Sequence, residues 1–232
     1  MKSSVDEIRA RFDQDVERFA NLETGQSATV DALLGLELIA EAAAACTPNA
    51  RRLLDVGCGA GNYSLKLLER LPGLDVTLID LSRPMLDRAE LRLRESSAKS
   101  VRAIQGDVRE IELGESAFDL IVAAAVLHHL RTDAEWEGVF AKFQRALARG
   151  GTMWVFDMME AELPVVRPIL WAHYARYLEG LKGPAYRDHV SPTSRRRTRR
   201  GRSSTNSTCC AGSGSRRSRC CTGTRASRRS VP

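Results

Sequence analysis

The sequence predicts an α/β fold in which a mainly parallel, doubly wound sheet is flanked by helices. Apolar runs of strand length within residues 53–80, 101–111, 118–130 and 145–157 alternate with segments of helical spacing. Such alternation favours parallel pairing, because each parallel strand is reached through a crossover that covers a face of the sheet. In addition, residues 53–80 combine a strand, a glycine-rich turn, a helix and a second strand, which is typical of a nucleotide-binding βαβ unit.

The glycine-rich turn is the most informative segment. Gly57, Gly59 and Gly61 stand at alternate positions, where the backbone can turn sharply off the strand and a ligand can come close. Asp80 ends the next strand, 19 residues after Gly61, where a carboxylate can accept hydrogen bonds from both hydroxyls of a ribose. An NAD(P)-binding turn or a tight loop without a ligand are the alternatives for this pattern.

The GxGxG spacing, preceded by Asp55 and with Cys58 between two glycines, resembles the first motif of the class I S-adenosylmethionine-dependent methyltransferases. The resemblance is strong over residues 50–160. It implies a Rossmann-like fold, S-adenosyl-L-methionine as the cofactor and S-adenosyl-L-homocysteine as the product. The family's sheet has seven strands, of which the last two form a C-terminal hairpin.

The next helix is expected over residues 81–95. Ser82 suits its N-cap and Pro84 its first turn. Its apolar face is predicted to consist of Met85, Leu86, Ala89, Leu91 and Leu93.

The third strand ends at Gly106-Asp107, and Asp107 resembles the family's acidic residue that receives the adenine amino group. The carboxyl ends of the strands converge in such a sheet, so the binding residues are expected to meet there. The implied cofactor-binding set is Asp55, Gly57, Cys58, Gly59, Gly61, Asp80, Leu81, Met85, Asp107, Val108 and Ala124.

His128 and His129, in the loop after the fourth strand, are the candidate catalytic residues, because that loop borders the methyl group in the resembling family. Either could serve as a general base, and the alternative is that one of them only packs or forms a hydrogen bond. The preceding residues 123–126 are Ala-Ala-Ala-Val and do not resemble the Asn-Pro-Pro-Tyr or Asp-Pro-Pro-Tyr motif of amino methyltransferases of DNA and some proteins, which disfavours nucleobase N-methylation. This apolar turn favours a small or lipophilic acceptor at oxygen, carbon or nitrogen.

Four regions are predicted. Residues 1–48 form an N-terminal helical cap with Leu33, Leu34, Leu36, Leu38 and Ile39 as its buried stripe, and residues 49–162 form the cofactor-binding core. Residues 163–190 form a helical insertion that either closes over the substrate or simply packs. Its aromatic and imidazole side chains are Trp171, His173, Tyr174, Tyr177, Tyr186 and His189.

The fourth region, residues 191–232, differs sharply from the rest. It holds 12 of the 35 basic residues and no acidic one, so residues 1–190 carry 23 basic and 29 acidic side chains, a net charge of −6. It also lacks Leu, Ile, Phe and Tyr, so it is predicted to be disordered. Regrouping plausible codons by one base yields a helix, Gly-Phe and two strands. A frameshift therefore competes with a genuine basic arm, and it implies that the family's C-terminal hairpin is missing or disrupted.

Composition narrows the remaining possibilities. No apolar run reaches 18 residues, and the start resembles no signal peptide, so no membrane contact and a cytoplasmic location are expected. Adjacent cysteine pairs without a nearby histidine argue against a metal site. The predicted function is methyl transfer from S-adenosylmethionine to a small-molecule acceptor. The alternatives are a non-catalytic S-adenosylmethionine-binding protein or, if the basic tail is genuine, an RNA-modifying methyltransferase. The oligomeric state stays open.

Overall fold

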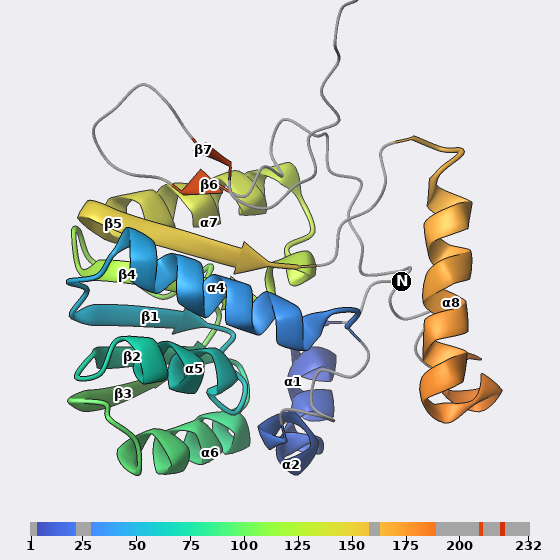
Figure 1. Ribbon diagram of the computed structural model, residues 1–232, viewed down its shortest axis with the longest axis horizontal. Coiled ribbons are helices and arrows are strands. Elements are labelled where there is room, and N and C mark those ends of the chain that lie inside the picture. The colour runs from blue at the N-terminus through green and yellow to red at the C-terminus, as the bar shows by residue number, and fades with distance from the viewer. Residues whose placement is uncertain (1–3, 22–28, 158–162, 189–208, 211–218, 221–232) are drawn as a thin grey trace, which may run out of the picture.

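The computed structural model describes residues 4–21, 29–157, 163–188, 209–210 and 219–220. Five parallel strands form one sheet in the order β3-β2-β1-β4-β5 (Figure 1), which confirms the predicted doubly wound α/β fold. The strands are β1 (Arg52–Val56), β2 (Asp75–Asp80), β3 (Ser100–Gln105), β4 (Phe118–Ala124) and β5 (Leu147–Phe156). The strand order reverses beside β1, and in folds of this type the crevice at that point is where ligands bind.

Helices cover the two faces of the sheet unequally. One face packs against α4 (Ala32–Cys46), α5 (Asn62–Arg70) and α6 (Arg83–Arg94), which share a core cluster with the alternate side chains of β1, β2 and β4. The other face packs against α7 (Asp133–Ala146), whose Val139, Phe143 and Ala146 join the remaining strand side chains. Strands buried on both faces explain why their sequences are almost continuously apolar.

The predicted buried stripe of α4 is wrong in part. Leu36 and Ile39 are buried, whereas Leu33, Leu34 and Leu38 are between 44% and 57% exposed. The buried face also contains small residues, Gly35, Ala40 and Ala43. A Cβ on Gly35 would lie 2.5 Å from the ring of Phe156, so the helix can approach the sheet closely only along its small side chains.

The helix α6 begins as predicted. Ser82 is its N-cap, with its hydroxyl accepting a hydrogen bond from the backbone N–H of Met85, and Pro84 lies in the first turn. Met85, Leu86, Ala89 and Leu93 are buried, but Leu91 is 51% exposed, which corrects the predicted face. Leu91 lies two residues from both Ala89 and Leu93, and that spacing turns it away from their face of the helix.

The strand β5 includes Gly150 and Gly151. Regular pairing with β4 starts only at Thr152, after a shift of register between Phe118 and Leu120. Gly150 has a φ of +81°, so a left-handed kink remains within the strand.

The remaining described helices gather beyond the carboxyl ends of the strands, where the arrowheads of Figure 1 point. They are α1 (Val5–Asp13), α2 (Val16–Ala20) and α8 (Arg167–Lys182). In the predicted basic tail, only the backbone of β6 (Cys209–Cys210) and β7 (Arg219–Cys220) is described, as a short antiparallel pair. The rest of the tail prediction, 191–208, 211–218 and 221–232, lies outside the described residues. Within the described parts of the chain, no helix has the length and apolarity needed to cross a bilayer.

Candidate active site

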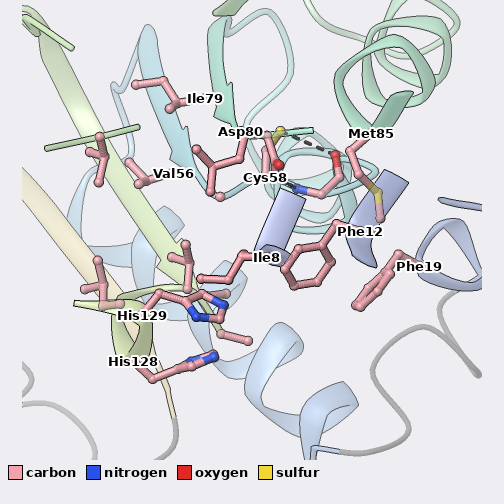
Figure 2. A pocket seen from close by; sticks show the side chains of 18 of the residues that line it. Ile8, Phe12, Phe19, Val56, Cys58, Ile79, Asp80, Met85, His128 and His129 are labelled. Carbon is pink, nitrogen blue, oxygen red and sulfur yellow. Dashed lines mark hydrogen bonds between the residues drawn. The ribbon is translucent and has the colours of Figure 1, made fainter. Parts of the chain in front are cut away.

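A cavity of about 530 Å³ opens at the carboxyl ends of the strands. Ligand sites in proteins commonly have this size. Every sequence-predicted site residue lines it except Gly61; these residues are Asp55, Gly57, Cys58, Gly59, Asp80, Leu81, Met85, Asp107, Val108, Ala124, His128 and His129. In Figure 2 Asp80 and Met85 lie at one end of the cavity and the two histidines at the other, with Ile8 and Phe12 between them.

The three glycines of the loop are required for two different reasons. All have positive φ angles, +65°, +50° and +83° for Gly57, Gly59 and Gly61. A Cβ on Gly57 would lie 2.4 Å from Val126 Cγ2, and one on Gly61 would lie 3.2 Å from Ala89 of α6. A Cβ on Gly59 would meet nothing within 4 Å, so it would project into open space. Gly57 and Gly61 thus serve packing, whereas Gly59 leaves room for a ligand beside the backbone.

Asp80 holds the glycine loop from the end of β2. Its Oδ2 accepts a hydrogen bond from the Gly59 backbone N–H at 2.8 Å, and its Oδ1 accepts one from the Ser82 N–H at 2.9 Å. Burial raises the pKa of this carboxyl, and the hydrogen bonds from the backbone act in the opposite direction. The carboxylate therefore fixes the loop in addition to facing the cavity.

Beneath the loop, Asp55 is fully buried. Its Oδ2 accepts a hydrogen bond of 2.6 Å from the Ser64 hydroxyl, while burial raises its pKa to about 7. The neighbouring Cys58 thiol is also buried, and burial raises its pKa well above the usual value. This thiol is therefore un-ionised at neutral pH, which fits a packing role in the loop.

Asp107 is engaged by a neighbouring arginine. Its carboxylate accepts hydrogen bonds from the Arg109 backbone N–H and from Nε, both at 2.9 Å, and the guanidinium also reaches Glu135 of α7. Although the carboxyl is partly buried, the hydrogen bonds and charge of Arg109 hold the pKa of Asp107 below its usual value. Asp107 is thus ionised and held rigidly at the rim of the cavity.

The two histidines lie in the 3₁₀ turn η1 (Leu127–His129) that follows β4. His128 contacts Asp157, the residue directly after β5, in two ways: the backbone N–H donates to Oδ2 at 3.0 Å, and Nδ1 lies 2.6 Å from Oδ1. The side chains of this pair are only 5% and 7% exposed. The preceding Ala125 has a φ of +53°, a strained conformation that aims the turn into the cavity.

Several buried polar atoms at this end have no hydrogen-bond partner within the part of the chain that the structure describes. They are His128 Nε2, His129 Nε2 and Tyr63 Oη. Burial lowers the pKa of His129 to about 3, so its imidazole is neutral, and burial raises the pKa of the Tyr63 hydroxyl. Unpaired buried polar atoms are rare in folded proteins, and at a cavity wall they point to a ligand that completes them.

The helix α1 covers one side of the cavity. Ile8 and Phe12 line it, and the ring of Phe12 meets that of His129 edge to face with 6.2 Å between centroids. The Ser82 hydroxyl donates a 2.5 Å hydrogen bond to Asp13 and so ties this helix to the start of α6. From the aromatic insertion, Tyr174 and Tyr186 also line the cavity.

Sequence reasoning missed Asp157 and Arg109. Asp157 directly follows the fifth strand, and Asp80 is the last residue of the second, so the rule that located Asp80 could have found Asp157. Arg109 had no such signal, because its role depends on Glu135 reaching it from α7.

Comparisons with known proteins agree with this geometry. Residues 53–151 match a family model described as a methyltransferase domain. An uncharacterized methyltransferase of Mycobacterium tuberculosis is 31% identical over 51% of this chain and 55% of its own length. The malonyl-[acyl-carrier protein] O-methyltransferase of a Paenibacillus species is 30% identical over 44% of this chain and 37% of its own length. The chain thus spans about half, or less, of these relatives.

Among solved structures, the N-methyltransferase NodS from Bradyrhizobium japonicum, in complex with S-adenosyl-L-homocysteine, has a similar fold. The TM-score is 0.51 at 23% identity, over 62% of this chain and 71% of that one. The strand order, the glycine loop and the methyltransferase-domain match agree with one another. Over residues 53–151, where the family model matches, the chain carries a methyltransferase domain with the class I, Rossmann-like fold.

Proposed function

We propose that this chain binds S-adenosyl-L-methionine and transfers its methyl group to a small-molecule acceptor, releasing S-adenosyl-L-homocysteine. The observation that carries the proposal is the open space beside Gly59. This backbone is left bare by glycine, is held by Asp80 and faces the cavity. A Cβ at this position would occupy the space that the cofactor needs, so the loop fits a ligand that lies along it.

The cofactor end of the cavity has the donors and acceptors that such a ligand requires. Each oxygen of the Asp80 carboxylate can accept more than one hydrogen bond, so lone pairs remain for the ribose hydroxyls beside the bonds from the Gly59 and Ser82 N–H groups. Asp107, kept ionised by Arg109, is assigned to the adenine amino group, beside the backbone of Val108. Leu81, Met85 and Ala124 supply apolar walls.

At the other end of the cavity we assign the role of general base to His128 and not to His129. S-adenosylmethionine supplies an electrophilic methyl group on a sulfonium that departs as a neutral thioether. His128 Nε2 is buried at the cavity wall without a partner in the described residues, so it can take a proton from an acceptor. His129 resists protonation because of its low pKa, and it contributes a neutral ring that packs against Phe12.

The regions that flank the core are part of the proposal. The cap, residues 1–48, closes the cavity through α1, and the insertion, residues 163–190, contributes Tyr174 and Tyr186 to the acceptor side. We also propose a cytoplasmic location. Cys46 and Cys58, the cysteines whose side chains are described, are both free thiols, as is usual in a reducing compartment.

Two measurements on the full chain test the proposal. Calorimetry with S-adenosylmethionine and S-adenosylhomocysteine should detect binding with micromolar or weaker affinity. A screen for transfer of a radiolabelled methyl group across a small-molecule library should detect product. Binding without transfer to any acceptor would favour a non-catalytic binding protein, and transfer confined to RNA would favour the RNA-modifying alternative. Absence of binding would refute the cofactor assignment.

A further inference from the structure

The pair formed by His128 and Asp157 determines which imidazole nitrogen carries the proton. The backbone N–H of His128 can only donate, so Asp157 Oδ2, 3.0 Å away, must accept from it. The other oxygen, Oδ1, lies 2.6 Å from Nδ1, and a carboxylate can only accept there as well. Nδ1 therefore bears hydrogen, and in the neutral ring Nε2 keeps a free lone pair.

This lone pair lies inside the cavity. Nε2 of His128 is buried and has no hydrogen-bond partner in the part of the chain that the structure describes, and the residue lines the cavity wall. Both side chains of the pair are almost fully buried, which excludes water from the contact and keeps the ring in one orientation.

We propose that Asp157 is a positioning residue that locks His128 in the Nδ1–H tautomer, so that Nε2 accepts the proton of a hydroxyl acceptor. The inference rests on the proposed function and deepens it by naming the acceptor class. A carboxylate is already deprotonated at neutral pH and needs no base, and a neutral amine attacks through a lone pair it already has. A phenolic or enolic hydroxyl is the acceptor that gains most from a buried base during attack.

The proton released during methyl transfer is taken up by His128 and stabilised by Asp157. As the acceptor oxygen forms its bond to the methyl carbon, the O–H proton moves to His128 Nε2, and the electrons of the carbon–sulfur bond stay on sulfur. The ring becomes an imidazolium whose Nδ1–H still donates to Asp157, whose negative charge stabilises it. Loss of the proton to solvent after product release restores the neutral ring.

The charged and titratable groups around the two histidines come from four elements. Asp157 follows β5, His129 lies in the turn η1 with Arg131 just after it, Tyr63 belongs to α5 and Arg11 to α1. His129 stays neutral over the working range because burial lowers its pKa to about 3, and the raised pKa of Tyr63 keeps its hydroxyl protonated. Neither group competes with Nε2 for the proton.

The variant Asp157→Asn tests the proposal with little change of shape. Its amide oxygen must face the His128 backbone N–H, because the alternative places two donors against each other. The amide NH₂ then faces Nδ1 and donates to it, which forces the ring proton onto Nε2 and removes the base. Asp75→Asn is the matched control, because this exposed carboxylate contacts Lys99 and Ser100 at the opposite end of the sheet.

Long-range ¹H–¹⁵N NMR spectra of the full chain report the tautomer without any substrate. The chain has four histidines, and the spectrum of His128→Gln identifies the signals of His128. The expected result is the Nδ1–H tautomer in the unmodified protein and in the control Asp75→Asn, and the Nε2–H tautomer in Asp157→Asn. An Nε2–H tautomer in the unmodified protein would overturn the proposal, even if the variant fails to fold.

Kinetics with a hydroxyl acceptor from the screen provide the second readout. Asp157→Asn should lower kcat by about 10²- to 10⁴-fold with KM little changed. The double variant His128→Gln/Asp157→Asn should have a kcat no lower than that of the slower single variant, because both changes remove the same base. Wild-type rates in Asp157→Asn, or transfer confined to amines or carboxylates, would overturn the inference. Failure to bind S-adenosylmethionine would instead refute the proposed function, and the tautomer would still be measured.

Discussion

The two ends of the cavity are built differently. At the cofactor end, the carboxylates already have partners within the protein: Asp55 has Ser64, Asp80 has two backbone N–H groups, and Asp107 has Arg109. At the acceptor end, buried polar atoms of His128, His129 and Tyr63 have no partner in the described residues. The carboxylates at one end are thus held by the protein before any ligand arrives, whereas the buried polar atoms at the other end gain their partners from a ligand.

The difference has a thermodynamic meaning. Hydrogen bonds that are already formed stabilise the fold and preorganise the loop, so their loss should weaken stability and binding together. Unpaired buried groups cost stability in the free protein, so their removal should spare the fold and impair only the reaction.

The largest effect is expected from Gly59→Val. A valine at a φ of +50° would be strained, and its side chain would fill the open space beside the loop. Binding of S-adenosylmethionine, measured by calorimetry, should be lost. Gly73→Val is the control, since Gly73 has a φ of +80° with open space around it but lies away from the cavity. The control should lose stability and retain binding; normal binding by Gly59→Val would show that the loop is not the cofactor site.

The second-largest effect is expected from Asp80→Ala. It leaves the Gly59 and Ser82 N–H groups without their acceptor, and unpaired buried groups cost about 1–3 kcal/mol each. Stability to urea should fall, and affinity for S-adenosylmethionine should fall at least about tenfold, because charge-assisted bonds contribute about 1.5–3 kcal/mol. Asp119→Ala is the matched control, since Asp119 also accepts hydrogen bonds from two backbone N–H groups but lies at the opposite end of the sheet. It should lower stability alone. Equal affinity in both variants would contradict the ribose assignment.

The contributions of the two ends of the cavity to stability should depend on pH in opposite directions. The pKa of Asp55 rises from 3.8 to about 7 on folding, so its contribution to stability falls as pH rises from 4 to 7. The pKa of His129 falls from 6.5 to about 3, so its contribution is lost as pH falls from 6.5 to 3. Between pH 4 and 6.5 the two slopes oppose each other.

Urea unfolding at several pH values within this window separates these contributions. Compared with the unmodified protein, Asp55→Asn should make stability rise more steeply with pH, and His129→Gln should make it fall more steeply. Each change is at most about 1.4 kcal/mol per pH unit. Identical pH profiles for the two variants would refute the opposing assignments.

The smallest effect on stability is expected from Tyr63→Phe. Removing a buried hydroxyl without a partner in the described residues should change the free energy of unfolding by less than about 1 kcal/mol, or stabilise the protein. Ser64→Ala, on the same helix, removes a buried hydroxyl that donates to Asp55 and should cost more. If Tyr63→Phe is the more destabilising of the two, the Tyr63 hydroxyl has a partner in solution.

The sequence was sufficient wherever a role depends on local order along the chain. Asp80 and Asp107 could be placed because they lie at or just after the carboxyl ends of strands, and Ser82 because it precedes a helix. Prediction from the sequence failed where a contact with a distant part of the chain determines the role of a residue. The leucines of α4 surround the helix, and only the contact of Gly35 with Phe156 determines which of them are buried. Likewise, Gly61 matches the motif but faces α6 and not the cavity.

The position of α1 over the cavity has a consequence for the order in which the protein folds. The segment that closes the site comes first in the chain, yet its contacts lie far ahead: Asp13 bonds Ser82, and Phe12 meets His129. During synthesis this segment emerges before its partners exist, so it can dock only after the sheet has formed. We therefore expect the site to mature last, and a fusion or truncation at the N-terminus to impair ligand binding while the sheet still folds.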